Sequence, residues 1–99
     1  MLNIEKRSED TKLEILLEGR LDSSTSAQLE SVVKGSLEGV KTLVFEMEKL
    51  EYISSAGLRV LLVAQKTMNK QGSMVIRNSS QDIKDVFEVT GFADILTLE

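Results

Sequence analysis

The stretch that decides the fold is residues 43–68, L-V-F-E-M-E-K-L-E-Y-I-S-S-A-G-L-R-V-L-L-V-A-Q-K-T-M. It begins with a short apolar run, Leu43–Met47, which is typical of a central strand. From Leu58 to Met68 the apolar residues instead recur at helical spacing. Between the two lies Tyr52–Gly57, a loop rich in small residues. The stretch therefore predicts one strand-to-helix crossover of a parallel sheet.

The rest of the chain continues this alternation of strands and helices. Lys12–Glu18 alternates apolar and polar residues with a period of two, and the polar turn Ser8–Thr11 separates it from a short strand at Asn3–Lys6. These two strands predict an antiparallel hairpin. The other predicted elements are a helix at Leu29–Leu37, a strand at Met74–Ile76, a helix at Ile83–Thr90 ended by Gly91, and a last strand at Ile95–Leu98. The order β-β-α-β-α-β-α-β predicts an α/β fold with a mostly parallel sheet and an initial antiparallel hairpin.

The composition narrows the classes of function. A chain of 99 residues that is 41% hydrophobic and 28% charged is typical of one globular domain, here residues 1–99. It contains no cysteine and no histidine, which excludes disulfides, zinc–thiolate sites and every catalytic pair built on those side chains. No set of carboxylates suggests a metal site. We therefore expect no enzyme activity, no cofactor and no metal.

The charges and the lengths of the apolar segments indicate the location of the protein and the partners that it lacks. The net charge is −4, from 16 acidic and 12 basic residues, and no basic stripe typical of nucleic-acid binding is present. No segment approaches the about 20 apolar residues that a membrane-spanning helix needs. The N-terminus lacks the apolar stretch of a signal peptide. We expect a cytoplasmic protein without nucleic-acid partners and without membrane insertion.

Two loops that follow predicted strands are candidate functional sites, because functional loops of open α/β sheets gather at the carboxyl ends of the strands. They are Gly19–Ser23, which contains Asp22, and Tyr52–Gly57, which contains Ser54 and Ser55. A phosphate on either serine would meet the unpaired N–H groups and the positive end of the following helix. A serine or an aspartate before a helix is more often a plain helix cap, and this applies to both serines and to Asp22. The residues alone leave both alternatives open.

The chain resembles the STAS domain family, and within it the stand-alone anti-sigma-factor antagonists. The resemblance extends along essentially the whole chain. It rests on Gly19–Asp22, on Tyr52–Leu62 with its run S-S-A-G-L-R-V-L-L, and on Val89–Phe92. The central motif is fairly specific, and the two flanking motifs support it by their positions.

The family register implies a phosphorylation site. The usual central run of the family is D-S-[ST/A]-G-L, in which the serine after the aspartate accepts the phosphate. Gly57 and Leu58 align this chain with that run. Ser55 then takes the phosphoacceptor position, and Ser54 stands where the family usually has aspartate. The resemblance implies phosphorylation at Ser55, with Ser54 as the fallback.

The resemblance also implies a mechanism and partners. The unphosphorylated protein would bind an anti-sigma factor that has serine kinase activity and thereby release the sigma factor. The kinase would then phosphorylate the serine and dissociate, and a serine phosphatase would reset the cycle. The residues expected to bind the partner are Asp22, Ser23, Ser54, Ala56, Gly57 and Arg59.

Two other expectations accompany this one. The main alternative is a phosphorylation-independent STAS scaffold, such as an accessory subunit of a lipid-transport complex or a stress-sensing assembly. Many relatives carry one more helix after the position of Glu99. The apolar surface that this helix would cover predicts weak self-association into a homodimer.

Overall fold

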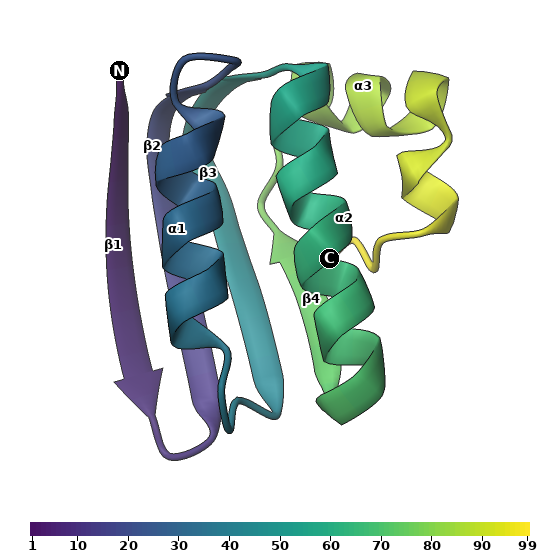
Figure 1. Cartoon of the computed structure of the whole chain (residues 1–99). Helices are drawn as coiled ribbons and strands as arrows, with labels where there is room; N and C mark the ends of the chain where they lie inside the picture. Colours follow the sequence, from purple (N-terminus) through teal and green to yellow (C-terminus); the bar gives the residue numbers. More distant parts are fainter.

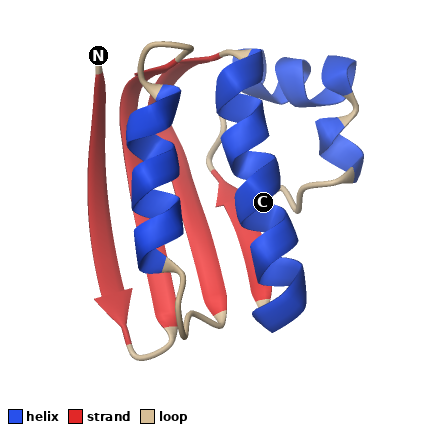
Figure 2. Cartoon of the chain, in the orientation of Figure 1, coloured by secondary structure: helices blue, strands red, loops and turns tan.

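The computed structural model of the chain describes residues 1–99 and shows a four-stranded sheet whose helices pack against one face (Figures 1 and 2). The strands are β1 (Leu2–Glu9), β2 (Lys12–Leu21), β3 (Thr42–Ile53) and β4 (Ser73–Arg77). The helices are α1 (Ser26–Ser36), α2 (Ser55–Gln71) and α3 (Gln81–Thr90), with a short 3₁₀ turn, η1, at Phe92–Asp94. The strands lie in the order β1-β2-β3-β4. β1 is antiparallel to β2 and the other pairs are parallel, which confirms the predicted fold class.

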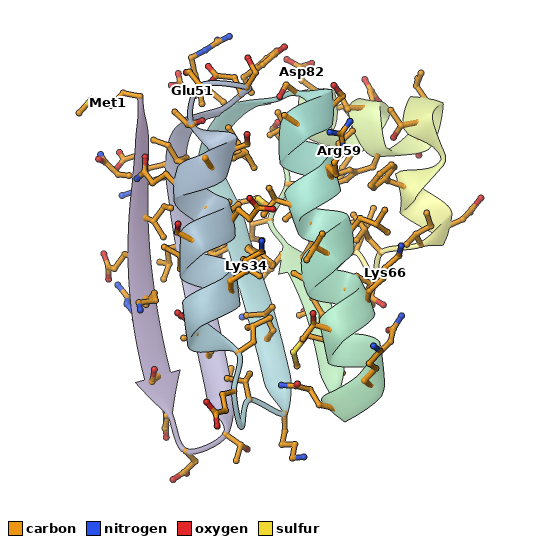
Figure 3. All side chains as sticks on the ribbon, in the orientation of Figure 1. Met1, Lys34, Glu51, Arg59, Lys66 and Asp82 are labelled. Atoms are coloured by element: carbon orange, nitrogen blue, oxygen red, sulfur yellow. The ribbon has the colours of Figure 1, made fainter.

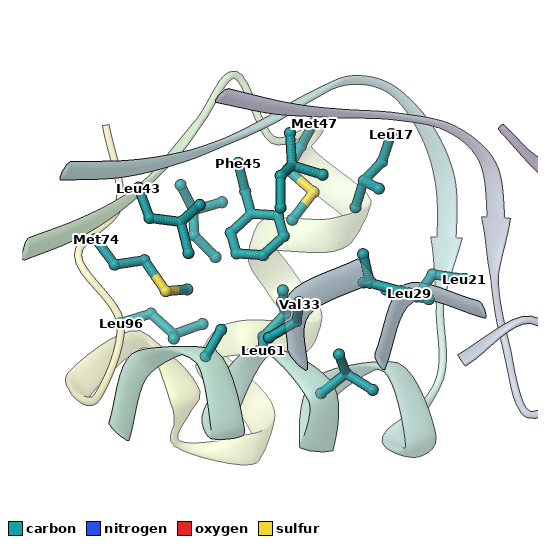
Figure 4. Close-up of a cluster of buried hydrophobic side chains, with 14 of the residues drawn as sticks. Leu17, Leu21, Leu29, Val33, Leu43, Phe45, Met47, Leu61, Met74 and Leu96 are labelled. Carbon is teal, nitrogen blue, oxygen red and sulfur yellow. The ribbon is translucent and has the colours of Figure 1, made fainter. Parts of the chain in front are cut away.

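The hydrophobic core lies between the sheet and the helices (Figure 4). Leu13, Ile15 and Leu17 of β2 all point into it, as the period of two predicts. From the helices, the core receives Leu29 and Val33 of α1, Leu58 and Leu61 of α2, and Ile83 and Phe87 of α3. Because each helix buries one apolar stripe on the same face, the starts of α1 and α2 are held against the strands that precede them.

The last predicted strand is wrong in extent. Residues Ile95–Leu98 form no fifth strand, and only Leu98 makes a single parallel bridge, to Ile76 of β4. The N–H groups of Ile95 and Leu96 donate to the carbonyl of Phe92, at 3.0 and 2.8 Å. These bonds close a turn and occupy donors that a strand would need. The turn follows Gly91, whose φ of 82° ends α3 as predicted.

No helix of the structure has the length and apolar character needed to cross a membrane.

Candidate functional site

The carboxyl ends of β2 and β3 lie side by side, and a helix begins shortly after each. In the parallel register Arg20 pairs with Tyr52 and Leu21 with Ile53. The N–H of Ser54 then donates to the carbonyl of Leu21 at 2.9 Å. The two loops that the sequence singled out therefore meet at one edge of the sheet, as their positions after parallel strands predict.

These loops are shorter than predicted. Gly19–Leu21 belongs to β2, and Tyr52–Ile53 belongs to β3, because the ladder between the two strands continues to their ends. Only Asp22–Thr25 connects β2 to α1, and Ser54 alone connects β3 to α2. The candidate site is thus attached to regular elements on both sides.

The two adjacent serines have different environments. Ser54 is the N-cap of α2, and its half-buried hydroxyl accepts a hydrogen bond from the N–H of Gly57 at 3.4 Å. Ser55 is the first residue of the helix and is exposed. Its hydroxyl has no hydrogen-bond partner, and the first turn of α2 contains no acidic residue. The cap interpretation therefore applies to Ser54 and leaves the hydroxyl of Ser55 free.

Asp22 organises the turn before α1. Its Oδ1 accepts hydrogen bonds from the N–H and the hydroxyl of Ser24, at 3.0 and 2.7 Å, and from the N–H of Thr25 at 3.1 Å. The hydroxyl of Ser24 is the main reason why the pKa of Asp22 lies below its ordinary value. Asp22 therefore caps the turn, as the cap interpretation expects, but the N-cap position of α1 itself belongs to Thr25.

Thr25 is buried and links this turn to β2. Its hydroxyl accepts from the N–H of Asp22 and lies 2.9 Å from the carbonyl of Arg20, to which it donates. Its side chain makes no cap bond to α1. Ser23, the other predicted partner-binding residue of this turn, is exposed. The hydrogen bonds of Thr25 thus hold Ser23 on a turn of fixed shape.

Gly57 sets how closely α2 approaches the strand ends. A Cβ at this buried position would lie 2.6 Å from Cγ of Leu21 and 3.0 Å from Cγ1 of Ile53. Real Cβ atoms do not come that near, so the first turn of α2 can contact both strands only if residue 57 has no side chain. Gly57 therefore supports the site by packing.

Sequence reasoning missed the pair formed by Arg20 and Tyr52. The guanidinium carbon of Arg20 lies 4.2 Å from the centre of the Tyr52 ring, and its Nε lies 3.8 Å from Oδ2 of Asp22. Leu21 and Ile53, the next residues of the two strands, are buried under the helices, so Arg20 and Tyr52 project to the opposite, open face. No sequence signal indicates this pair, because it depends on the register between β2 and β3.

A small hollow lies between the N-terminal halves of α1 and α2, beside Ser55. Its volume is about 160 Å³, and its walls are Ser26, Ala27, Glu30, Ala56, Arg59 and Val60. Arg59 is exposed and takes part in no ion pair, whereas Glu30 lies 3.8 Å from Lys34. Figure 3 shows Arg59 on the upper half of α2 and Lys66 further along the same helix. The hollow thus combines small side chains with an unpaired cation.

The hydroxyl of Ser55 stands apart from other reactive groups. The hydroxyl of Ser55 has no base beside it that could activate it as a catalytic nucleophile. No group of three or more carboxylates is placed to hold a metal ion. An exposed hydroxyl of this kind can receive a group that another protein transfers.

Comparison with known proteins identifies the class. A model of the STAS domain family matches residues 3–99. The chain therefore belongs to the STAS domain family.

Two relatives specify the branch of that family. Over 88 residues, the chain is 38% identical to BtrV of Bordetella bronchiseptica, a protein assigned as an anti-sigma factor antagonist, with 87% of this chain and 76% of BtrV covered. Over 97 residues, it is 30% identical to the anti-sigma-B factor antagonist of Staphylococcus aureus, with 96% and 90% covered. The resemblance inferred from the motifs is confirmed at this level.

The fold is also that of solved antagonists. The unphosphorylated form of the Bacillus antagonist SpoIIAA superposes with a TM-score of 0.76 at 20% identity and covers 100% of this chain and 87% of that chain. The phosphorylated form of SpoIIAA gives a TM-score of 0.75, also at 20% identity, with 100% and 91% covered. At this identity the likeness concerns the fold alone.

Proposed function

We propose that this protein is an anti-sigma-factor antagonist that is switched by phosphorylation of Ser55. In the unmodified form it binds an anti-sigma factor with serine kinase activity, in the cytoplasm, and so releases the sigma factor. Phosphorylation of Ser55 by that kinase ends the complex, and a serine phosphatase restores the active form. The protein needs no cofactor and catalyses no step itself.

The observation that carries this proposal is the difference between the two serines. Ser54 is engaged as the cap of α2, whereas the hydroxyl of Ser55 is exposed and unbonded. A kinase can reach Ser55 without breaking a hydrogen bond of the fold. The position also matches the phosphoacceptor of the family motif, and SpoIIAA has been solved in a phosphorylated form.

Electrostatics supports the direction of the switch. A phosphoserine adds a charge of about −1.5 to −2. At the first residue of a helix this charge is stabilised by the unpaired N–H groups, so the fold tolerates it. In a packed interface the same charge loses water and meets any acidic group of the partner, which weakens binding.

The exposed and half-buried residues around Ser55 form the proposed partner surface. Ser23 lies on the turn before α1, and Ala56 and Arg59 line the hollow between α1 and α2. Gly57 is buried and acts by letting α2 approach the strands. The surface is thus proposed to span both strand-to-helix junctions.

The decisive experiment is phosphate transfer. The protein is incubated with ATP and each histidine-kinase-like anti-sigma factor of the same genome, and intact mass and site mapping follow. We expect one phosphate on Ser55, absent from Ser55→Ala and retained in Ser54→Ala. The Ser54→Ala variant is the matched control, and loss of its cap should cost about 1 kcal/mol of stability.

Two outcomes would contradict the proposal. Phosphate that site mapping places on Ser54, in the native protein or in Ser55→Ala, would make Ser54 the acceptor. An anti-sigma factor that binds the protein but transfers no phosphate would support the phosphorylation-independent scaffold instead.

A further inference from the structure

Ser55 and Arg59 lie one helical turn apart on α2, at positions i and i+4. Both are exposed, and neither has an ion-pair partner. On an α-helix such positions are neighbours, with Cβ atoms about 5–6 Å apart. An anion N-terminal to a cation is the more favourable orientation of such a pair. A phosphate on Ser55 would therefore lie within reach of the guanidinium of Arg59.

We propose that Arg59 is the residue that responds to the modification. In the phosphorylated protein its guanidinium binds the phosphoryl group on Ser55. In the unmodified protein the same guanidinium is available to a carboxylate of the anti-sigma factor that docks at the hollow between α1 and α2. After phosphorylation, the guanidinium of Arg59 is therefore no longer available to the carboxylate of the partner. This inference rests on the proposed function and specifies which residue changes its binding partner when Ser55 is phosphorylated.

The charges around the hollow favour Arg59 for this role. Two other basic groups are already paired, Lys34 of α1 with Glu30 and Arg20 of β2 with Asp22. Arg20 also stacks on Tyr52, on the opposite face of the sheet. Arg59 is thus the unpaired cation at the hollow.

The chemistry of the guanidinium suits both of its proposed partners. Its planar donors match a carboxylate or a phosphate with two parallel hydrogen bonds, and such charge-assisted bonds are stronger than neutral ones. The hollow, with a volume of about 160 Å³ and walls that include Ala27 and Ala56, has room for a side chain of the partner. A carboxylate at its rim would pair with Arg59.

The test of the intramolecular pair uses protein in which phosphoserine is incorporated at position 55 during synthesis, so that no kinase is needed. The second pKa of the phosphate, ordinarily about 6, is measured by ³¹P NMR titration. We expect Arg59→Gln to raise this pKa by about 0.2–0.4 pH units, which is the size of an i,i+4 ion pair. Arg59→Lys should restore part of the difference.

Lys66→Gln is the matched control, because Lys66 is an exposed cation of the same helix about two turns further on. It should leave the pKa of the phosphate unchanged. The acidic residues Asp22, before α1, and Glu30, in α1, are the same in every variant, as are Glu51 and Asp82, which Figure 3 shows at the same end of the molecule. If the phosphate has the same pKa with Arg59 and with Arg59→Gln, the proposed contact between the phosphate and Arg59 is wrong.

The second measurement concerns the partner. With the anti-sigma factor that binds the unmodified protein, Arg59→Gln should weaken binding about tenfold or more, as expected for a lost charge-assisted hydrogen bond. Lys66→Gln should not. Equal affinity of the native and Arg59→Gln proteins would overturn the role of Arg59 in the interface. Absence of phosphate transfer to Ser55 would instead contradict the proposed function, so the two failures are distinguishable.

Discussion

The two strand-to-helix junctions at the carboxyl edge of the sheet differ in how they use their polar groups. In the turn Asp22–Thr25, the carboxylate of Asp22 and the hydroxyl of Thr25 are both engaged by hydrogen bonds within the turn and to β2. At the junction between β3 and α2, Ser54 makes one cap bond of 3.4 Å and Ser55 makes none. The difference shows that one edge can hold a closed turn of fixed shape beside a hydroxyl that is free to be modified.

The largest effect is expected from a substitution that disrupts the junction between β3 and α2. Gly57→Ala should lower the free energy of unfolding by about 2 kcal/mol, because the added methyl group overlaps Leu21 and overpacking outweighs the better helix propensity of alanine. Urea denaturation measures the change. Gly35→Ala is the control, since a Cβ on Gly35 of α1 meets nothing within 4 Å and should add about 0.5–1 kcal/mol. Equal effects of the two substitutions would contradict the proposed close packing at Gly57.

An intermediate effect is expected from opening the first junction. Thr25→Val keeps the shape of the buried side chain but removes the hydroxyl that contacts the N–H of Asp22 and the carbonyl of Arg20. We expect a loss of about 1–1.5 kcal/mol, also measured by urea denaturation. Ser23→Ala in the same turn is exposed and should change stability by about 0.5 kcal/mol or less. A Thr25→Val protein as stable as the native one would show that the turn does not depend on these bonds.

The smallest effect concerns pH. The folded pKa of Asp22 is lowered, so its contribution to stability is fully present above its ordinary pKa of 3.8 and is lost as the pH falls through the folded value. The melting temperature of Asp22→Asn should therefore lie below that of the native protein at pH 6, and the difference should shrink below about pH 4. Ser24→Ala removes the main donor and should raise the pKa of Asp22 toward its ordinary value. A difference that is constant with pH would argue against a lowered pKa.

Much of the fold could be predicted because it follows local patterns. The alternation of Leu13, Ile15 and Leu17 predicts the inward face of β2, and Gly91 predicts the end of α3. The prediction of a last strand is wrong because the turn in its place is closed by hydrogen bonds to the carbonyl of Phe92, which apolar spacing does not reveal.

The length of β3 was hidden by irregular pairing. Between Glu46 and Lys49, and again between Leu50 and Tyr52, β3 contains one residue more than the matching part of β2. The buried residues Met47, Leu50 and Ile53 consequently recur every third position, a spacing that the period of two excludes. The sequence therefore suggested a strand that ends near Met47.

The same irregularity limited the prediction of the site. The family register selects Ser55 without any geometry, and the position of Asp22 after the second strand indicates a neighbouring loop. The contact between Arg20 and Tyr52 follows from the shifted register and could not be inferred.

The connection of β3 to α2 through the single residue Ser54 has a consequence for signalling. Gly57 packs against both strand ends, so the start of α2 is closely attached to the sheet at the position of Ser55. A phosphate at this position would alter the electrostatic potential of the surface while the backbone keeps its path. The protein would then transmit its state as a change of charge on a rigid scaffold, with no conformational rearrangement to propagate.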